Sequence, residues 1–128
     1  MRILYINAVA KIASTGRTIL ELTKNLQEQG HETYVVYSEG ELDFSEGYHM
    51  ANQRDKKLHA LLSRITGLVG YFSKGETKKM LKKIEEWRPD VVQMDNLHSN
   101  YVDIPMLLKY LGEKNIPSVI VLHDCFMF

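Results

Sequence analysis

The sequence predicts an α/β fold: a Rossmann-like three-layer α/β/α sandwich built on a small parallel sheet. Short apolar runs alternate along the chain with longer segments in which apolar residues recur every three to four positions. Strands that alternate with helices in this way form parallel sheets whose connecting helices cover both faces. With 128 residues, of which 45% are hydrophobic and 25% charged, residues 1–128 have the length and composition of one globular domain.

The first unit of the predicted fold is a strand, a helix and a second strand. Residues 3–6 form a short apolar run, which is typical of a strand buried on both faces. A loop of small residues follows through Gly16, and apolar residues at helical spacing then predict a helix that ends at Gly30. Residues 33–37 are β-branched and aromatic, so they predict the second strand.

The middle of the chain predicts a loop followed by two helices. Residues 39–53 are polar and predict the loop. Residues 54–72 carry a wide apolar stripe at helical spacing, which two glycines weaken. After a break at residues 73–75, a second apolar stripe predicts another helix, which ends before Pro89.

The last unit is a strand, a short helix and a fourth strand. Residues 91–94 and 118–122 predict the two strands, and residues 95–102 form the loop that follows the first of them. Asp103 is suited to be the N-cap of the helix, and Pro105 lies in its first turn. The predicted order is therefore β-α-β-(α-α)-β-α-β, with right-handed crossovers.

Composition argues against several classes of protein. The formal net charge is zero, so no general attraction to nucleic acid is expected. The single Cys125 cannot form an internal disulfide or a cysteine-based zinc site, and it is compatible with a reducing cytoplasm. No apolar run approaches the roughly 20 residues that span a bilayer. We therefore expect a cytoplasmic protein.

The charge is unevenly distributed, because residues 54–83 are strongly basic. This segment contains nine Lys and Arg residues and two acidic residues, a net charge of +7 (9 − 2 = 7) that the rest of the chain balances. Lys78, Lys79, Lys82 and Lys83 share one face of a predicted helix. One hypothesis is peripheral contact with the inner face of the cell membrane through residues 54–83. The alternative is that the apolar stripes pack on the sheet and the lysines are solvated.

Three loops leave the carboxyl ends of predicted strands, where open parallel sheets bind their ligands. The first, residues 7–17, ends at a helix N-terminus, where free N–H groups and the helix dipole favour an anion. Ser14, Thr15, Gly16 and Arg17 there predict a cradle for a phosphate or diphosphate. The alternative is a Ser or Thr N-cap with an exposed arginine, because the spacing is neither that of G-x-G-x-x-G nor that of a Walker P-loop.

The second loop, residues 93–101, gathers polar side chains. The loop offers the several donors and acceptors that a polyhydroxyl ligand such as a sugar requires, on Asp95, Asn96, His98, Asn100 and Tyr101. The alternative is a turn whose Asn and Asp side chains cap the backbone before the next helix.

The third loop carries His123 and Asp124 directly after the fourth strand, and this titratable pair is the predicted catalytic pair. A histidine at this position can act as a general acid or base, bind a metal, or donate a hydrogen bond to a substrate. A metal site formed with His98 is not indicated by the spacing. A nucleophilic Cys125 paired with a histidine would require an exposed, activated thiol.

Four stretches in this order resemble a known family. They are the turn STGR at 14–17 after the opening strand; EQGHE at 28–32; RPDVV at 88–92 leading to NLH at 96–98; and NIPSV at 115–119 leading to LHDC at 122–125. Together they resemble the N-terminal domain of GT-B fold glycosyltransferases, in the retaining family 4 group that builds bacterial capsular and surface polysaccharides.

The resemblance implies two Rossmann-like domains that face each other across a cleft. The N-terminal domain mainly holds a glycan or lipid-linked acceptor, and the C-terminal domain binds the nucleotide-sugar donor. The turn at Gly16 and Arg17 matches the family's loop near the donor diphosphate, and His123 matches its histidine near the transferred sugar. No metal or other cofactor is implied, because helix dipoles and basic side chains stabilise the leaving diphosphate.

The sequence also departs from the family pattern. Gln93 and Asp95 stand where close relatives have histidines, and no donor domain is present. The chain therefore resembles the front part of a larger enzyme and is expected to be inactive alone. A stand-alone Rossmann- or flavodoxin-like module for a phosphorylated ligand and a non-catalytic interaction domain are the alternatives. The first reading expects Gly16, Arg17, His98 and His123 to converge at one edge of the sheet.

Overall fold

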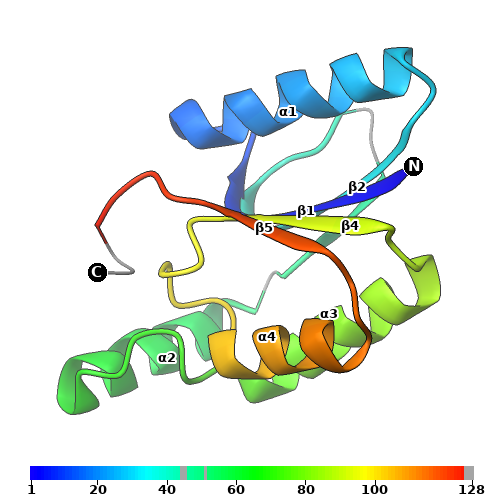
Figure 1. The fold of residues 1–128 in the computed structure, drawn as a ribbon. Helices are drawn as coiled ribbons and strands as arrows, with labels where there is room; N and C mark the ends of the chain where they lie inside the picture. Colours follow the sequence, from blue (N-terminus) through cyan, green and yellow to red (C-terminus); the bar gives the residue numbers. More distant parts are fainter. Residues whose placement is uncertain (44–45, 51, 126–128) are drawn as a thin grey trace.

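The computed structural model describes residues 1–43, 46–50 and 52–125, and shows a parallel sheet between two layers of helices (Figure 1). Within these residues five strands pair in the order β3-β2-β1-β4-β5. The strands are β1 (Arg2–Ala10), β2 (Glu32–Gly40), β3 (Glu46–His49), β4 (Val91–Asp95) and β5 (Ser118–Val121); the helices are α1 (Ala13–Glu28), α2 (Gln53–Thr66), α3 (Lys74–Trp87) and α4 (Ile104–Glu113). The predicted three-layer α/β/α sandwich is confirmed.

The helices divide between the two faces of the sheet as the alternation of patterns predicts. Helix α1 covers one face, and α2, α3 and α4 lie on the other (Figure 1). Alternate residues of β1 enter the two cores: Leu4 and Ile6 pack with the core of α3 and α4, whereas Tyr5 packs with Ile19 of α1. Because the central strands are covered on both sides, they read as continuous apolar runs.

The structure adds an edge strand, β3, where the sequence predicts a loop. Its four residues pair in parallel with β2, from Tyr34 opposite Glu46 to Tyr37 opposite His49. All four are exposed or only half-buried. A strand with one neighbour and a solvated face needs no apolar run, so hydrophobic patterning does not reveal it.

The first loop is also much shorter than predicted. Strand β1 extends to Ala10, which pairs with Gly40 of β2, and α1 begins at Ala13. At Gly40 the φ angle is +98°, and a Cβ atom there would lie 1.8 Å from the carbonyl oxygen of Ala10. Glycine allows this close approach of the two strands, so most of the predicted loop belongs to β1 or to the first turn of α1.

The basic segment behaves differently in its two helices. In α3 the apolar residues are buried, with Met80 and Ile84 fully inaccessible, and Lys79 and Lys83 form ion pairs with glutamates of the same helix. For α3 the structure therefore agrees with the alternative of a stripe packed on the sheet beside solvated lysines. In α2, which ends at Gly67 in the left-handed conformation, the apolar stripe is exposed instead.

The end of the chain forms the other edge of the sheet. Asp103 caps α4 as predicted, since its side chain accepts a hydrogen bond from the Met106 amide at 2.9 Å, and a proline lies in the first turn. Strand β5 follows and carries the exposed Val119 and Ile120. The apolar residues 126–128, which the sequence places after Cys125, lie outside the described residues.

Candidate functional site

The carboxyl ends of β1, β4 and β5 are adjacent, so the chain segments that follow these strands meet at one edge of the sheet. The register of the β4–β5 pair places Asp95 opposite Val121. His123 lies two residues after Val121, in the bend that follows β5, and so stands close to Asp95 on the neighbouring strand. The register thus brings the two side chains together across the strand pair.

A short hydrogen bond joins His123 to Asp95. The distance from His123 Nε2 to Asp95 Oδ1 is 2.7 Å, and Gln93 Nε2 donates to the other carboxylate oxygen at 3.1 Å. Asp95 is buried at 3% exposure, whereas one third of the His123 side chain is exposed. An ionised carboxylate only accepts, so Nε2 carries the hydrogen and Nδ1 is left for a ligand. Asp95 therefore fixes both the orientation and the protonated nitrogen of the imidazole.

The buried carboxylate of Asp95 contributes to the raised pKa of two tyrosines. Burial, with a further contribution from the charge of Asp95, raises the pKa of the Tyr5 hydroxyl above its ordinary value. The same two causes raise the pKa of Tyr101. Both phenols thus stay protonated, and the negative charge beside His123 belongs to Asp95.

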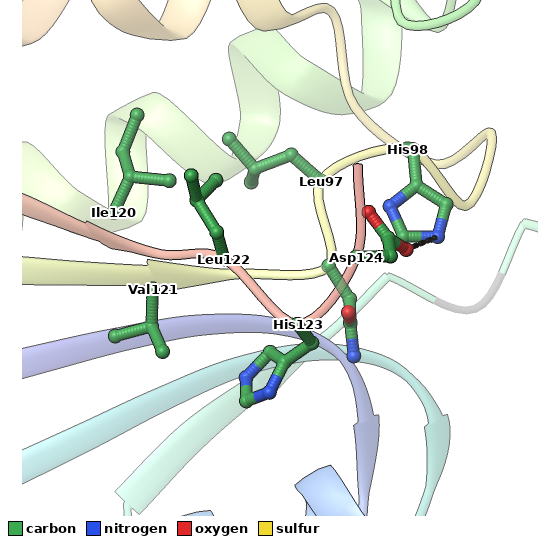
Figure 2. Close-up of a pocket in the computed structure, with 8 residues that line it drawn as sticks. Leu97, His98, Ile120, Val121, Leu122, His123 and Asp124 are labelled. Carbon is green, nitrogen blue, oxygen red and sulfur yellow. Dashed lines mark ion pairs between the residues drawn. The ribbon is translucent and has the colours of Figure 1, made fainter. Parts of the chain in front are cut away.

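A second histidine pairs with the other carboxylate of the rim. His98 Nε2 lies 3.3 Å from Asp124 Oδ2, as the dashed line in Figure 2 marks. The pocket beside it is lined by Asn96, Leu97, His98, Ile120, Val121, Leu122, His123 and Asp124 (Figure 2). Its volume of about 20 Å³ accommodates one water molecule, so a sugar would have to lie across its mouth.

The first turn of α1 reaches the same edge of the sheet. Its N-cap is Ile12, and no side chain caps it, so the predicted alternative of a Ser or Thr N-cap is wrong. The predicted anion cradle lies here: Ser14 and Arg17 are exposed, and Gly16 is buried. A Cβ atom on Gly16 would lie 3.1 Å from the Lys11 amide nitrogen, so glycine lets the helix start close to the chain that precedes it.

Asn96 connects this turn to the loop that carries His98. Its Nδ2 donates a hydrogen bond to Thr15 Oγ1 at 3.0 Å, across 81 positions of sequence. The φ angle of Asn96 is +48°, a left-handed conformation that asparagine tolerates better than most residues. The predicted convergence of the three loops at one edge is therefore present.

Two of the predicted acceptor residues do not lie with the other site residues at this edge of the sheet. Tyr101 is 2% exposed and packs in the core of α3 and α4, and among the described residues its hydroxyl has no hydrogen-bond partner. Asn100 turns toward α2, where its Oδ1 accepts a hydrogen bond from Ser63 Oγ at 3.2 Å. A polar residue in a loop can pack inward when a partner or an apolar contact is available, and its residue type alone does not reveal this.

Sequence reasoning missed Asp95 as the partner of His123. The signal was present in the spacing, because Gln93 and Asp95 alternate along a strand next to the one that ends before His123. Only the register of the β4–β5 pair shows that this spacing brings Asp95 close to His123. Within the described residues no three His, Cys, Asp or Glu side chains are grouped closely enough to hold a metal ion, and Cys125 is exposed with a free thiol.

Comparison with known proteins gives a consistent result. The family model described as Glycosyltransferase Family 4 matches residues 15–127. No curated protein sequence matches the chain. Among solved structures, spinosyn rhamnosyltransferase SpnG complexed with thymidine diphosphate is similar with a TM-score of 0.54 and 22% identity, over 94% of this chain and 34% of that one.

A second solved structure is the glycosyltransferase SsfS6 from Streptomyces sp. SF2575, with a TM-score of 0.49 and 19% identity. The match covers 94% of this chain and 38% of that one. At these identities the likeness to SpnG concerns the fold alone, and SsfS6 adds no argument. The chain spans about a third of the length of either structure.

Proposed function

Because the chain belongs to glycosyltransferase family 4, we propose that it is the acceptor-side part of an enzyme that transfers a sugar from a nucleotide-sugar donor. The acceptor is a polysaccharide or a lipid-linked glycan. The observation that carries this proposal is the hydrogen bond between Asn96 and Thr15, since it joins an uncapped helix N-terminus to the histidine-bearing rim. A diphosphate and a sugar are adjacent in a nucleotide-sugar, and the helix N-terminus and the histidine-bearing rim are adjacent in this structure.

Each part of the rim has a role in the proposed reaction. Transfer breaks the bond between the anomeric carbon and a diphosphate oxygen, and forms a bond to an acceptor oxygen that loses its proton. Negative charge develops on the diphosphate, where the free amides of residues 13–15 and the Arg17 guanidinium would stabilise it. His123, oriented by Asp95, would bind the transferred sugar through Nδ1.

The acceptor would contact the other side of the same rim. Asn96, His98 and Asp124 surround the mouth of the small pocket and offer both donors and acceptors to sugar hydroxyls. Asn100 and Tyr101 would support this loop from behind, one through Ser63 and the other in the core. The donor nucleotide would be held mostly by a second domain, because the chain spans 34% of SpnG, whose structure contains thymidine diphosphate. We therefore expect the 128-residue chain alone to be inactive in transfer.

A binding experiment with the isolated chain tests the proposed diphosphate contacts at the N-terminus of α1. Amide resonances of residues 13–17 should shift in NMR spectra on addition of uridine, guanosine or thymidine diphosphate, with weak, millimolar affinity. Arg17→Gln should weaken the response, whereas Lys24→Gln, an exposed position further along the same helix, should not. Shifts confined to other surfaces would refute the proposal. Micromolar binding without any second domain would favour the stand-alone phosphoryl-binding module instead.

A further inference from the structure

Helix α2 presents its apolar row to the solvent. Leu58, Leu61 and Ile65 are 55%, 54% and 72% exposed, and their spacing of three and four places them on one face of the helix. The opposite face is polar and buried, with His59 at 1% and Ser63 at 7% exposure. A helix that covers a sheet normally buries its apolar face, so the orientation of α2 is reversed.

Hydrogen bonds of the buried polar face fix this orientation. His59 Nδ1 lies 2.7 Å from Ser73 Oγ, and His59 Nε2 accepts a hydrogen bond from the Gly70 amide at 3.3 Å. On the next turn, Ser63 Oγ donates to Asn100 Oδ1. Rotating the apolar row inward would break these bonds and leave buried polar groups unpaired, and this cost opposes the gain from burying the leucines.

Cations accompany the exposed row. Arg54, Lys57 and Arg64 are exposed, and with Lys56 and Asp55 they give α2 a net charge of +3 (4 − 1 = 3). Lys56 is ion-paired with Glu39. In the described part of the chain no carboxylate lies within ion-pair distance of the other three cations.

The apolar surface continues beyond the end of the helix. Leu68 and Tyr71, in the segment that joins α2 to α3, are 49% and 51% exposed. A row of leucine and isoleucine bordered by lysine and arginine, with an aromatic residue at its end, is the composition of helices that lie in the interface of a membrane. Among the described residues no helix is long and apolar enough to cross a bilayer, so contact of this kind would be confined to one leaflet.

We propose that the exposed face of α2, with Leu68 and Tyr71, docks on the surface of an anionic lipid bilayer. Leu58, Leu61 and Ile65 enter the boundary between headgroups and acyl chains, and the cations contact lipid phosphates. Charge complementarity favours lipid over a second copy of the chain, because a two-fold contact through α2 would bring its own cations together. The whole chain is neutral, so attraction to anionic lipid requires a local basic surface such as this one.

The position of α2 gives the docking a consequence for the rim. The helix lies on the face of the sheet opposite α1 and extends toward the side where β5 ends (Figure 1). The bond from Ser63 to Asn100 ties it to the loop that carries His98. A bilayer under α2 would therefore lie beside the proposed acceptor site, although the docking itself does not depend on sugar transfer.

Vesicle flotation with the 128-residue chain tests the inference. Vesicles of phosphatidylcholine with added phosphatidylglycerol should bind the chain at low salt, less at high salt, and vesicles of phosphatidylcholine alone should bind little. The double variant L61E/I65E should abolish binding. Leu22→Glu, on the opposite side of the molecule at 38% exposure, should leave it unchanged.

A pair of charge variants separates local from general electrostatics. Neutralising Lys57 and Arg64 to Gln should lower the partition coefficient roughly thirty-fold, whereas the same loss of charge at Lys78 and Lys82 of α3 should have little effect. Circular dichroism checks that each variant folds. Absence of binding to anionic vesicles, equal effects of the two charge pairs, or a concentration-dependent dimer that I65E dissociates without any lipid binding would each overturn the proposal.

Discussion

His59 should make the stability of the fold depend on pH. Its Nε2 accepts a hydrogen bond from the Gly70 amide, and its Nδ1 bonds to Ser73 in a buried position. Burial lowers the pKa of His59 below its ordinary value of 6.5, and the charges of Asp55 and Asp103 oppose this shift only in part. The folded state therefore favours the neutral ring, and the unfolded state binds the proton more readily.

The sign and size of the effect follow from these bonds. The stabilising contribution is complete above pH 6.5, the unfolded pKa, and is lost as the pH falls through the lower pKa of the folded state. A proton on Nε2 would set two donors against each other at Gly70 and leave a buried amide unpaired, which costs about 1–3 kcal/mol. We expect the free energy of unfolding to fall by about that amount on acidification.

Urea denaturation from about pH 8 to about pH 5, followed by circular dichroism, measures the effect against the ordinary histidine range. His59→Phe should be less stable at neutral pH and should lose the contribution of this group to the slope. His59→Gln, whose side-chain oxygen can accept from Gly70, should be equally independent of pH but closer to the wild-type stability. If the wild type and both variants show the same slope, the neutral hydrogen-bonded ring does not control this transition and the reasoning fails.

Three further predictions concern the sheet and its rim. Gly40→Ala should lower the stability by about 3 kcal/mol or more, because the new Cβ would overlap the paired strand β1, whereas Gly30→Ala, with a positive φ but open space, should cost about 1 kcal/mol; equal losses in thermal melts would contradict this. Asp95→Asn should change the ring ¹⁵N resonances of His123, since a neutral amide replaces the charged acceptor, and unchanged resonances would exclude the pairing. Asp103→Ala should lower the unfolding free energy by about 1 kcal/mol through loss of the α4 cap, and a neutral result would mean the cap is redundant.

The sequence predicts the parts of this fold that depend on burial. Residues 3–6 are apolar throughout, and residues 91–94 are apolar except for Gln93, because they become inner strands of the sheet. The stripe around Met80 is apolar because it becomes the inner face of α3. Hydrophobic patterning reports burial directly. The pattern is misleading where polar residues are part of the sheet or of the buried surface. Strand β3 is a polar edge strand, and α2 buries the polar side of an amphipathic helix.

The sequence predicted where the candidate site lies better than it predicted which side chains contact each other there. The strand ends identify the rim, since neighbouring parallel strands deliver their following loops to one edge. The contacts between individual side chains depend on the register of the strands and on local turns. Both bring together segments that are distant in the sequence. Thus the pairing of Asp95 with His123 and the inward turn of Tyr101 could not be read from residue type.

Neighbours in sequence serve separate partners at the end of β5: His123 meets Asp95, and Asp124 meets His98. This division depends on the number of residues between Val121, which pairs with Asp95, and the bend at residues 123–125. Deleting or inserting one residue in β5 would exchange the two sides, and would set Asp124 or Leu122 against the carboxylate of Asp95. The spacing of this strand is therefore as much a part of the chemistry as the side chains themselves, and length changes belong in the preceding turn rather than here.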